Sequence, residues 1–399
     1  MTMNPNHRPD GEERKFSRRD ALKMSAAATA GILTAGPLLA TILGEPAATA
    51  QAAANPFASG RSLPLKELEH GAKLEGRLNT IALPPNWANY GQIIAGFKRR
   101  YGIPIDNEAP DDSSGQEIQA ITAYKHNAGL EPDGIDVGPS FAQTGKQQGL
   151  FTPYRVATWD TIPANLKDPH GYWTGDYYGV IAFGANRSVV KSVPQTWSDL
   201  LKPEYKNMVS IDGDPRSAND AFMAVWAAAL ANGGSLDDIT PGINFFAKLK
   251  RLGNFVPVDN LPANISRGTT PIALKWDYLL LGYAQQWKGH PDLTVVVPTS
   301  GVIGGYYCQA IPAYSHHPYA ARLWQEFLYS DEGQLLFLEG FAHPIRYQDL
   351  AKRGKIPARI AKQMPPASAY AHAQFPTIAQ TNKAAAVVQA QWGTKVVGG

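Results

Sequence analysis

Polar side chains at two predicted helix starts could bind an anion. Arg216 and Ser217 precede Asn219 in one loop, and Ser113 and Ser114 begin a second helix. A bidentate arginine and the free N–H groups of a helix N-terminus suit a carboxylate or a phosphonate. The alternative is that these serines only cap their helices, and the sequence leaves both interpretations open.

Acidic residues offer the opposite chemistry. Asp111-Asp112 could hold a cation, and Asp277 could grip an amine beside Trp276. More often, an acidic pair of this kind is a helix cap plus a solvated charge, and a single aspartate is an exposed carboxylate. His316-His317 is a poor chelating pair because adjacent side chains point in different directions. We therefore predict no metal site.

Catalytic motifs are absent from the sequence. It contains no G-x-S-x-G elbow, no phosphate-loop consensus, no G-x-G-x-x-G and no H-E-x-x-H. These absences favour a binding protein over an enzyme, and we expect no cofactor. An exported enzyme that carries a cofactor is kept as an alternative.

The elements that must position these residues follow an alternating pattern of strands and helices. Apolar runs predict strands at residues 78–83, 103–105, 135–137, 178–183, 209–211, 272–274 and 293–297. Helical spacing predicts helices at residues 90–101, 143–148, 222–231, 243–251, 319–328 and 332–338. Such alternation is typical of βαβ units and parallel sheets.

Ligands of open α/β sheets bind beyond the carboxyl ends of the strands. The loops predicted at those ends are 84–90, 111–114, 138–141, 212–219 and 275–278. Because they come from two α/β units, a cleft between two lobes is the expected site.

Composition places the chain among ordinary globular proteins. Of its 399 residues, 44% are hydrophobic and 18% are charged, and the formal net charge is +3. This near-neutral balance gives no indication of nucleic-acid or membrane-surface binding. The single cysteine, Cys308, cannot form a disulfide within the chain, and we expect it to be a buried small residue.

Residues 1–50 have the anatomy of an export signal. Arg18-Arg19 precedes an Ala-rich apolar run from Met24 to about Leu43, and Ala48-Thr49-Ala50 is suited to cleavage before Gln51. Adjacent arginines ahead of a mildly apolar run are typical of twin-arginine signals. The alternative is a membrane anchor, which the Ala, Thr and Ser content and Pro37 disfavour. We expect cleavage and a periplasmic protein.

Three stretches resemble a known family. They are residues 86–90 (NWANY), residues 196–206 (TWSDLLKPEYK), and residues 310–334, which begin AIPA and end FLYSDEGQ. The chain thereby resembles the type II periplasmic solute-binding proteins of ABC importers, particularly the spermidine/putrescine-binding branch with its ferric- and phosphonate-binding relatives. The resemblance covers most of residues 73–347.

The resemblance implies an α/β fold of two lobes, each a mixed, mostly parallel sheet flanked by helices, with the ligand cleft between the lobes. Lobe 1 is expected at residues 73–182, completed by about 305–340. Lobe 2 is expected at residues 187–300, completed by about 341–399. Hinge strands are expected near Val180–Asn186 and Gly304–Gln309.

The same resemblance assigns ligand contacts to four residues. Trp87 and Tyr90 match the N-W-x-x-Y aromatics of the polyamine cleft, Ser140 matches a ligand-contacting serine, and Trp276 matches a tryptophan after a second-lobe strand. Aromatic faces attract ammonium groups by about 0.5–2 kcal/mol each. The alternative for any one of these aromatics is ordinary core packing.

Departures from the polyamine pattern concern charge. A carboxylate expected just before Ala310 is missing, because the stretch reads Gly305-Tyr306-Tyr307-Cys308. The loop with Asp214, Arg216 and Ser217 resembles that of anion- and iron-binding relatives. Tyr306-Tyr307 is similar to the paired phenolates of ferric-binding proteins, but at a different position.

We therefore expect a carrier for a small amine-containing solute, such as an ω-amino acid, an aminophosphonate or a polyamine-like molecule. An anion- or ferric-binding protein of the same fold is the alternative. The expected partners are ABC permease subunits with a separate ATPase, and the carrier itself is expected to be a monomer.

The sequence predicts that replacing Trp87 or Trp276 with alanine weakens ligand binding tenfold or more while leaving the protein folded. The physical reason is loss of the aromatic face that attracts the ammonium group. Isothermal titration measures the affinity, and circular dichroism checks the fold. Unchanged affinity in both variants would contradict the predicted cleft.

Overall fold

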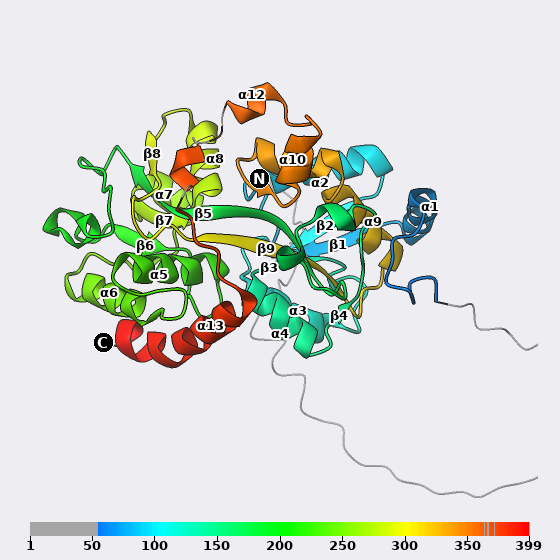
Figure 1. Ribbon diagram of the computed structural model, residues 1–399, viewed down its shortest axis with the longest axis horizontal. Coiled ribbons are helices and arrows are strands. Elements are labelled where there is room, and N and C mark those ends of the chain that lie inside the picture. The colour runs from blue at the N-terminus through cyan, green and yellow to red at the C-terminus, as the bar shows by residue number, and fades with distance from the viewer. Residues whose placement is uncertain (1–54, 363, 365–366, 371, 399) are drawn as a thin grey trace, which may run out of the picture. The chain divides into compact units, whose positions relative to one another are not determined.

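Two long strands organise the fold. The computed structural model describes residues 55–362, 364, 367–370 and 372–398, so the expected export signal lies outside the described residues. Strands β5 (Thr174–Asn186) and β9 (Gly304–Pro312) are buried along almost their whole length. They run side by side and antiparallel through the middle of the ribbon diagram in Figure 1. Continuous apolar runs, rather than alternating ones, suit strands that are covered on both faces.

The first lobe is built around β9 and the first part of β5. Strand β1 (Leu78–Ile81) pairs in parallel with β2 (Ile105–Glu108), whereas β3 (Ile135–Val137) and β4 (Phe151–Thr152) pair antiparallel with β9. The helices of this lobe are α1 (Leu65–Glu75), α2 (Tyr90–Tyr101), α3 (Ser114–Tyr124), α4 (Pro139–Gln147), α9 (Pro318–Leu328) and α10 (Asp331–Glu339). Short 3₁₀ turns lie at Trp159–Thr161 and Ala164–Leu166.

The second lobe is built on the rest of β5. From Ile181 to Asn186, β5 pairs antiparallel with β7 (Ile272–Trp276) and, over Phe183–Asn186, with β8 (Leu293–Val296). Strand β6 (Val209–Ile211) adds to β7 in parallel. The helices are α5 (Asn219–Ala231), α6 (Thr240–Arg251), α7 (Pro262–Arg267) and α8 (Asp277–Trp287), with 3₁₀ turns at Asp199–Leu201 and Pro203–Tyr205.

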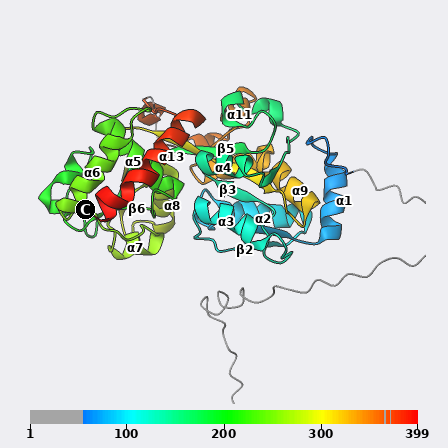
Figure 2. The same ribbon diagram turned by 90° about the horizontal axis from the view of Figure 1, so that it is seen from below.

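The last part of the chain returns to both lobes. Strand β10 (His343–Pro344) pairs with β5 at Tyr177 and Tyr178, beside the first lobe. It is followed by α11 (Tyr347–Lys352), α12 (Ala358–Ala361), a 3₁₀ turn at Ala367–Tyr370, α13 (Ile378–Trp392) and a π-helical turn at Gly393–Val397. Helix α13 packs against α4 and against α6, so it touches both lobes (Figure 2).

The expected two-lobed α/β fold is confirmed. Within the described residues, the parallel strand pairs are β1–β2 and β6–β7, one in each lobe, and every antiparallel pair includes β5 or β9. The sheets are therefore mixed but mostly antiparallel, rather than mostly parallel as expected, because the two strands that cross between the lobes run against their neighbours. None of the helices in the described part of the chain is long and apolar enough to cross a membrane.

Helix α5 forms the centre of the second lobe. Its residues from Asn219 to Ala229 are all buried, so the helix has no solvent-facing stripe over its first three turns. Helix α6 packs on it through Gly242, where an added Cβ would overlap the carbonyl oxygen of Val225. The absence of a side chain at this position lets the two helix backbones approach closely.

We expect Gly242→Ala to lower the free energy of unfolding by about 1–3 kcal/mol, because the new methyl group forces α6 away from α5. The matched control is Gly282→Ala in α8, where an added Cβ meets no atom within 4 Å. That change should stabilise the protein by about 0.5–1 kcal/mol, since alanine costs less backbone entropy in a helix than glycine does. Urea unfolding of both variants measures the difference, and equal effects would contradict the packing described for Gly242.

Candidate functional site

A cavity of about 400 Å³ lies where the loops of the two lobes face each other. Four of the five predicted strand-end loops contribute to its lining, which includes Trp87, Asp111, Asp212 and Lys275. The loop at 138–141 does not contribute, and the third strand contributes Asp136 instead. Helix starts and strand ends therefore supply most of its polar groups, as expected for an α/β fold.

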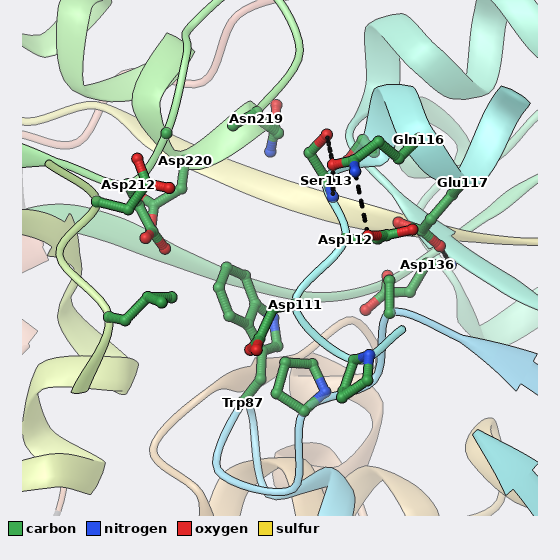
Figure 3. Close-up of a pocket in the computed structure, with 18 of the residues that line it drawn as sticks. Trp87, Asp111, Asp112, Ser113, Gln116, Glu117, Asp136, Asp212, Asn219 and Asp220 are labelled. Atoms are coloured by element: carbon green, nitrogen blue, oxygen red, sulfur yellow. Dashed lines mark hydrogen bonds between the residues drawn. The ribbon is translucent and has the colours of Figure 1, made fainter. Parts of the chain in front are cut away.

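Carboxylates are the most frequent charged groups in the cavity wall. Within the described part of the chain, eight lining residues are acidic: Asp111, Asp112, Glu117, Asp136, Asp212, Asp214, Asp220 and Asp259. Figure 3 shows Asp212 and Asp220 on one side of the cavity and Asp112, Glu117 and Asp136 on the other. Among the described lining residues, Lys275 is the one basic side chain. The cavity therefore favours a positively charged group.

Lys275 is buried at the end of β7 and contacts groups from both lobes. Its Nζ atom forms an ion pair with Asp212, lies 3.5 Å from Oδ2 of Asp220, and donates a hydrogen bond of 3.3 Å to Oδ1 of Asn260. The same atom lies 5.4 Å from the centre of the Trp87 ring. The ammonium group is thus held by protein acceptors and by an aromatic face.

Burial opposes charge at this cluster. It lowers the pKa of Lys275 well below its usual value, against the effect of Asp111, and it raises the pKa of Asp220 well above its usual value. In contact, the Lys275 ammonium and the Asp212 carboxylate offset part of this burial cost for each other.

Asp136 connects the cavity to a buried network on the strands that cross between the lobes. Its Oδ2 atom accepts hydrogen bonds from the hydroxyl groups of Tyr177 at 2.6 Å and Tyr90 at 2.8 Å. Gln309 of β9 donates to Oδ2 of Asp176 at 3.0 Å, and Tyr90 also reaches that atom at 3.3 Å. Burial raises the pKa of Asp136 to about 7, although the two phenolic hydrogen bonds act in the opposite direction.

Trp87 joins this network to the cavity wall. Its indole N–H donates to the hydroxyl oxygen of Tyr177 at 2.8 Å. Its ring lies edge-to-face with Tyr307, with the ring centres 5.5 Å apart. The hydrogen bond and the ring contact fix the plane of the indole, so Trp87 presents a defined face to the cavity.

Two serines and a glutamine organise the start of α3 at the cavity. Ser113 is its N-cap, and the Gln116 side chain accepts from the Ser113 backbone N–H at 2.9 Å, which forms a capping box. The hydroxyl oxygen of Ser114 accepts from the N–H of Gly138 at 3.1 Å. Ser113 and Ser114 therefore line the cavity and also complete local structure.

The loop before α5 meets α3 across the cavity. The backbone N–H of Gly115 donates to the carbonyl oxygen of Ser217 at 3.1 Å, which joins the two lobes directly. Asp214 and Ser217 line the cavity. Arg216 lies outside the lining, and its guanidinium group binds Asp214 through Nε at 2.9 Å and through Nη2 at 2.5 Å. The predicted anion-binding arginine is thus already paired with a carboxylate.

Some of the other predicted site residues line the cavity, and others lie behind it or outside it. Tyr307 and Trp87 line the cavity, whereas Trp276 is fully buried behind it and donates to the hydroxyl oxygen of Tyr307 at 3.3 Å. Tyr90 is likewise fully buried, in the network around Asp136. Ser140 lies in the first turn of α4, outside the lining, and its carbonyl oxygen accepts from Thr144.

Asp277 and Tyr306 also lie away from the cavity lining. Asp277 begins α8 and accepts from the N–H of Val180 at 3.0 Å and from the hydroxyl of Tyr370 at 2.6 Å. Tyr306 is buried in a smaller apolar cluster with Cys308 and its neighbours. The adjacent tyrosines therefore do not form a pair, since successive side chains of a strand point to opposite faces.

Five charged lining residues were not predicted from the sequence: Glu117, Asp136, Asp220, Asp259 and Lys275. One signal was available, because Lys275 and Asp136 each interrupt a short, otherwise apolar strand. A charge in such a strand has to reach a partner or a cavity, since an unpaired buried charge is costly. Glu117 and Asp220 lie in first helical turns, where acidic residues are common, and carried no distinct signal.

Two α/β lobes around a polar cavity define a class of binding proteins. The family of bacterial extracellular solute-binding proteins matches residues 134–379, which is more than half of the chain, and the chain belongs to this family. No curated protein matches the sequence.

Solved structures share the fold at low sequence identity. The periplasmic binding protein AfuA from Actinobacillus pleuropneumoniae, with fructose-6-phosphate bound, is 20% identical, with 81% of this chain and 99% of that chain covered and a TM-score of 0.60. AgtB from A. tumefaciens R10, in complex with agropinic acid, is 14% identical (81% and 99% covered, TM-score 0.64). Iron-bound HitA from Pseudomonas aeruginosa is 19% identical (79% and 99% covered, TM-score 0.58). Proteins of this fold thus hold chemically different solutes, so the solute of this chain has to be argued from its own cavity.

The raised pKa of Asp136 predicts a pH-dependent stability. Because the folded protein binds this proton more tightly than the unfolded chain does, the contribution is present at low pH and is lost as pH rises from about 4 to 7. The loss is at most about 1.4 kcal/mol per pH unit. Asp136→Asn keeps a neutral acceptor for Tyr90 and Tyr177, so the variant should gain stability over the wild type as pH rises.

Urea unfolding at pH 4, 6 and 8 measures this difference. Asp160→Asn, which removes an exposed carboxylate outside the cavity lining, is the control and should leave the profile unchanged. Parallel profiles for the wild type and Asp136→Asn would show that folding does not raise the pKa of Asp136 and would contradict the prediction.

Proposed function

We propose that this protein is the solute-binding component of an ABC importer and that it captures a small amine-containing solute. It is exported by the twin-arginine pathway to the periplasm, where it works as a monomer. Closure of the two lobes around the solute presents it to permease subunits, and a separate ATPase drives transport. In this role the protein is a carrier and performs no chemistry on its solute.

The observation that carries this proposal is the charge of the cavity. Eight acidic residues line it, and the described lining holds one lysine to balance them. Carboxylates gathered in a small space raise one another's pKa, and a bound cation relieves that repulsion. Burial raises the pKa of both Glu117 and Asp136 on the first-lobe side, and the charge of Asp136 adds to the rise at Glu117. A ligand ammonium group is therefore most favourable beside these residues.

The position of Arg216 supports the same assignment. An anion-binding protein needs a cationic group that is free to meet its ligand, but the Arg216 guanidinium is occupied by Asp214 and lies outside the lining. The cavity volume of about 400 Å³ is within the range of sites for small molecules. The ω-amino acids, aminophosphonates and polyamine-like molecules of the sequence prediction share the amine that this site would bind.

Strands β5 and β9 are the proposed hinge. They are the long strands that pass between the lobes, and β5 changes partners from β9 to β7 and β8 near Val180 and Ile181. A change of twist at that point would rotate one lobe against the other while both sheets keep their hydrogen bonds.

Four-carbon compounds that differ only in their end groups test the proposal. We expect n-butylamine and 4-aminobutanoate to raise the melting temperature, because each carries an ammonium group, whereas butanoate should have no effect. A ligand at 100 times its Kd stabilises the folded state by about 2.7 kcal/mol. Thermal shift gives the ranking, and isothermal titration then gives the affinity of each active compound.

A pair of charge-matched variants locates the binding. Asp111→Asn with Asp112→Asn removes two lining carboxylates and should weaken amine binding at least tenfold. Asp160→Asn with Asp237→Asn removes two exposed carboxylates outside the lining and should leave binding unchanged. Stabilisation by butanoate but by no amine would overturn the proposal and favour an anion carrier.

A further inference from the structure

We infer that Lys275 is a built-in ammonium group that occupies the second of two cation sites in the cavity, and that it thereby restricts the protein to ligands with one amine. This inference rests on the proposed function, because it specifies which amines the cavity accepts. It assigns Lys275 the role of a specificity determinant rather than of a ligand-binding group.

The surroundings of Lys275 are those of a bound ligand ammonium. Carboxylates from the loop after β6 and from the first turn of α5, Asp212 and Asp220, contact its Nζ atom, and Asn260 accepts a hydrogen bond from it. The Trp87 ring lies on another side, with its centre 5.4 Å away. Opposite charges, an amide oxygen and an aromatic face are the groups that recognise a free alkylammonium ion. Here the protein supplies that ion on its own side chain.

Lys275 is surrounded by acceptors of the protein itself. An ammonium group has three N–H bonds, and its three near acceptors are Asp212, Asp220 and Asn260. A ligand carboxylate that took one of these donors would leave an aspartate unpaired in a buried position, which costs several kcal/mol. Lys275 is therefore poorly suited to bind the carboxylate group of a zwitterionic ligand.

The two sides of the cavity consequently differ in charge. In the second lobe, Lys275 neutralises part of the charge of Asp212 and Asp220, whereas the carboxylates of Asp112, Glu117 and Asp136 lie on the other side of the cavity (Figure 3). The first amine of a ligand would bind on that other side. A second amine would meet the Lys275 ammonium, and repulsion between like charges in a partly buried site disfavours it.

Lys275→Met should convert the cavity from monoamine to diamine binding. Methionine retains much of the length of the stem but has no charge, so Asp212, Asp220 and the face of Trp87 become available to a second ligand ammonium. We expect the ratio of putrescine affinity to n-butylamine affinity, measured by isothermal titration, to rise at least tenfold over that of the wild type. Lys248→Met, at an exposed lysine of α6, should keep the wild-type ratio.

A second measurement needs no knowledge of the natural solute. Lys275→Ala removes the whole stem and leaves the buried Asp220 and the partly buried Asp212 without their cation, so its melting temperature should fall. Added alkylammonium ions should restore part of this loss, and n-butylammonium or n-propylammonium should restore more than ammonium, because their chains replace the missing stem. The rescue should vanish when Asp212→Asn and Asp220→Asn are added to Lys275→Ala.

If Lys275→Ala does not fold without an amine, the yield of refolded protein in the presence of each amine takes the place of the melting temperature. Rescue in Lys275→Ala without any amine binding by the wild type would overturn the proposed function but keep Lys275 as the occupant of a cation site. Amine binding by the wild type without rescue, or with an unchanged ratio in Lys275→Met, would overturn the inference alone. Putrescine binding to the wild type as tight as n-butylamine binding would also overturn it.

Discussion

The charge on a buried carboxylate is the constraint on which the rest of this site depends. Asp136 and Asp220 are both almost fully buried, and each is held in a different way. Phenolic hydroxyl groups donate to Oδ2 of Asp136, whereas the Lys275 ammonium lies 3.5 Å from Oδ2 of Asp220. Tyr90 comes from α2, Tyr177 from β5 and Lys275 from β7, so the electrostatics of the cavity depend on how the fold places these three elements.

The strands that cross between the lobes carry much of this chemistry. Asp176 and Tyr177 come from β5 and Gln309 from β9, and their side chains meet Asp136 of β3 in one buried network. A movement at these strands would change the distances within the network, and a change in protonation would alter the strands in turn. Under the proposed function, solute binding, lobe movement and proton uptake would therefore share the same few residues.

Much of the fold was predictable because it depends on local periodicity. The expected helix at 90–101 and the strands at 135–137 and 209–211 agree with α2, β3 and β6 residue for residue. Helix α8 was missed because residues 275–278 were interpreted as a loop, whereas Asp277 begins the helix. The strand-end rule likewise identified most of the loops that line the cavity, since it follows from the direction of the chain.

Side-chain partnership was not predictable, because it depends on contacts between residues distant in the sequence. Tyr90 matches a ligand-binding pattern, yet its hydroxyl group is used by Asp136 and Asp176. Arg216 has the right type for an anion site, but a carboxylate two residues away holds it. Lys275 carried a signal in its apolar strand, but only the tertiary structure shows that Asp212 and Trp87 surround its ammonium group.

The hydrogen bond between Gly115 and Ser217 joins the lobes through backbone atoms alone. Every residue except proline has an N–H group and every residue has a carbonyl oxygen, so this link does not depend on the side chain at Ser217. The cavity lining differs, because its charge depends on which side chain stands at each position. Mutations can thus replace lining side chains without breaking the backbone contact between the lobes. Proteins that descend from one ancestor with this fold can therefore come to bind different solutes while they keep that contact.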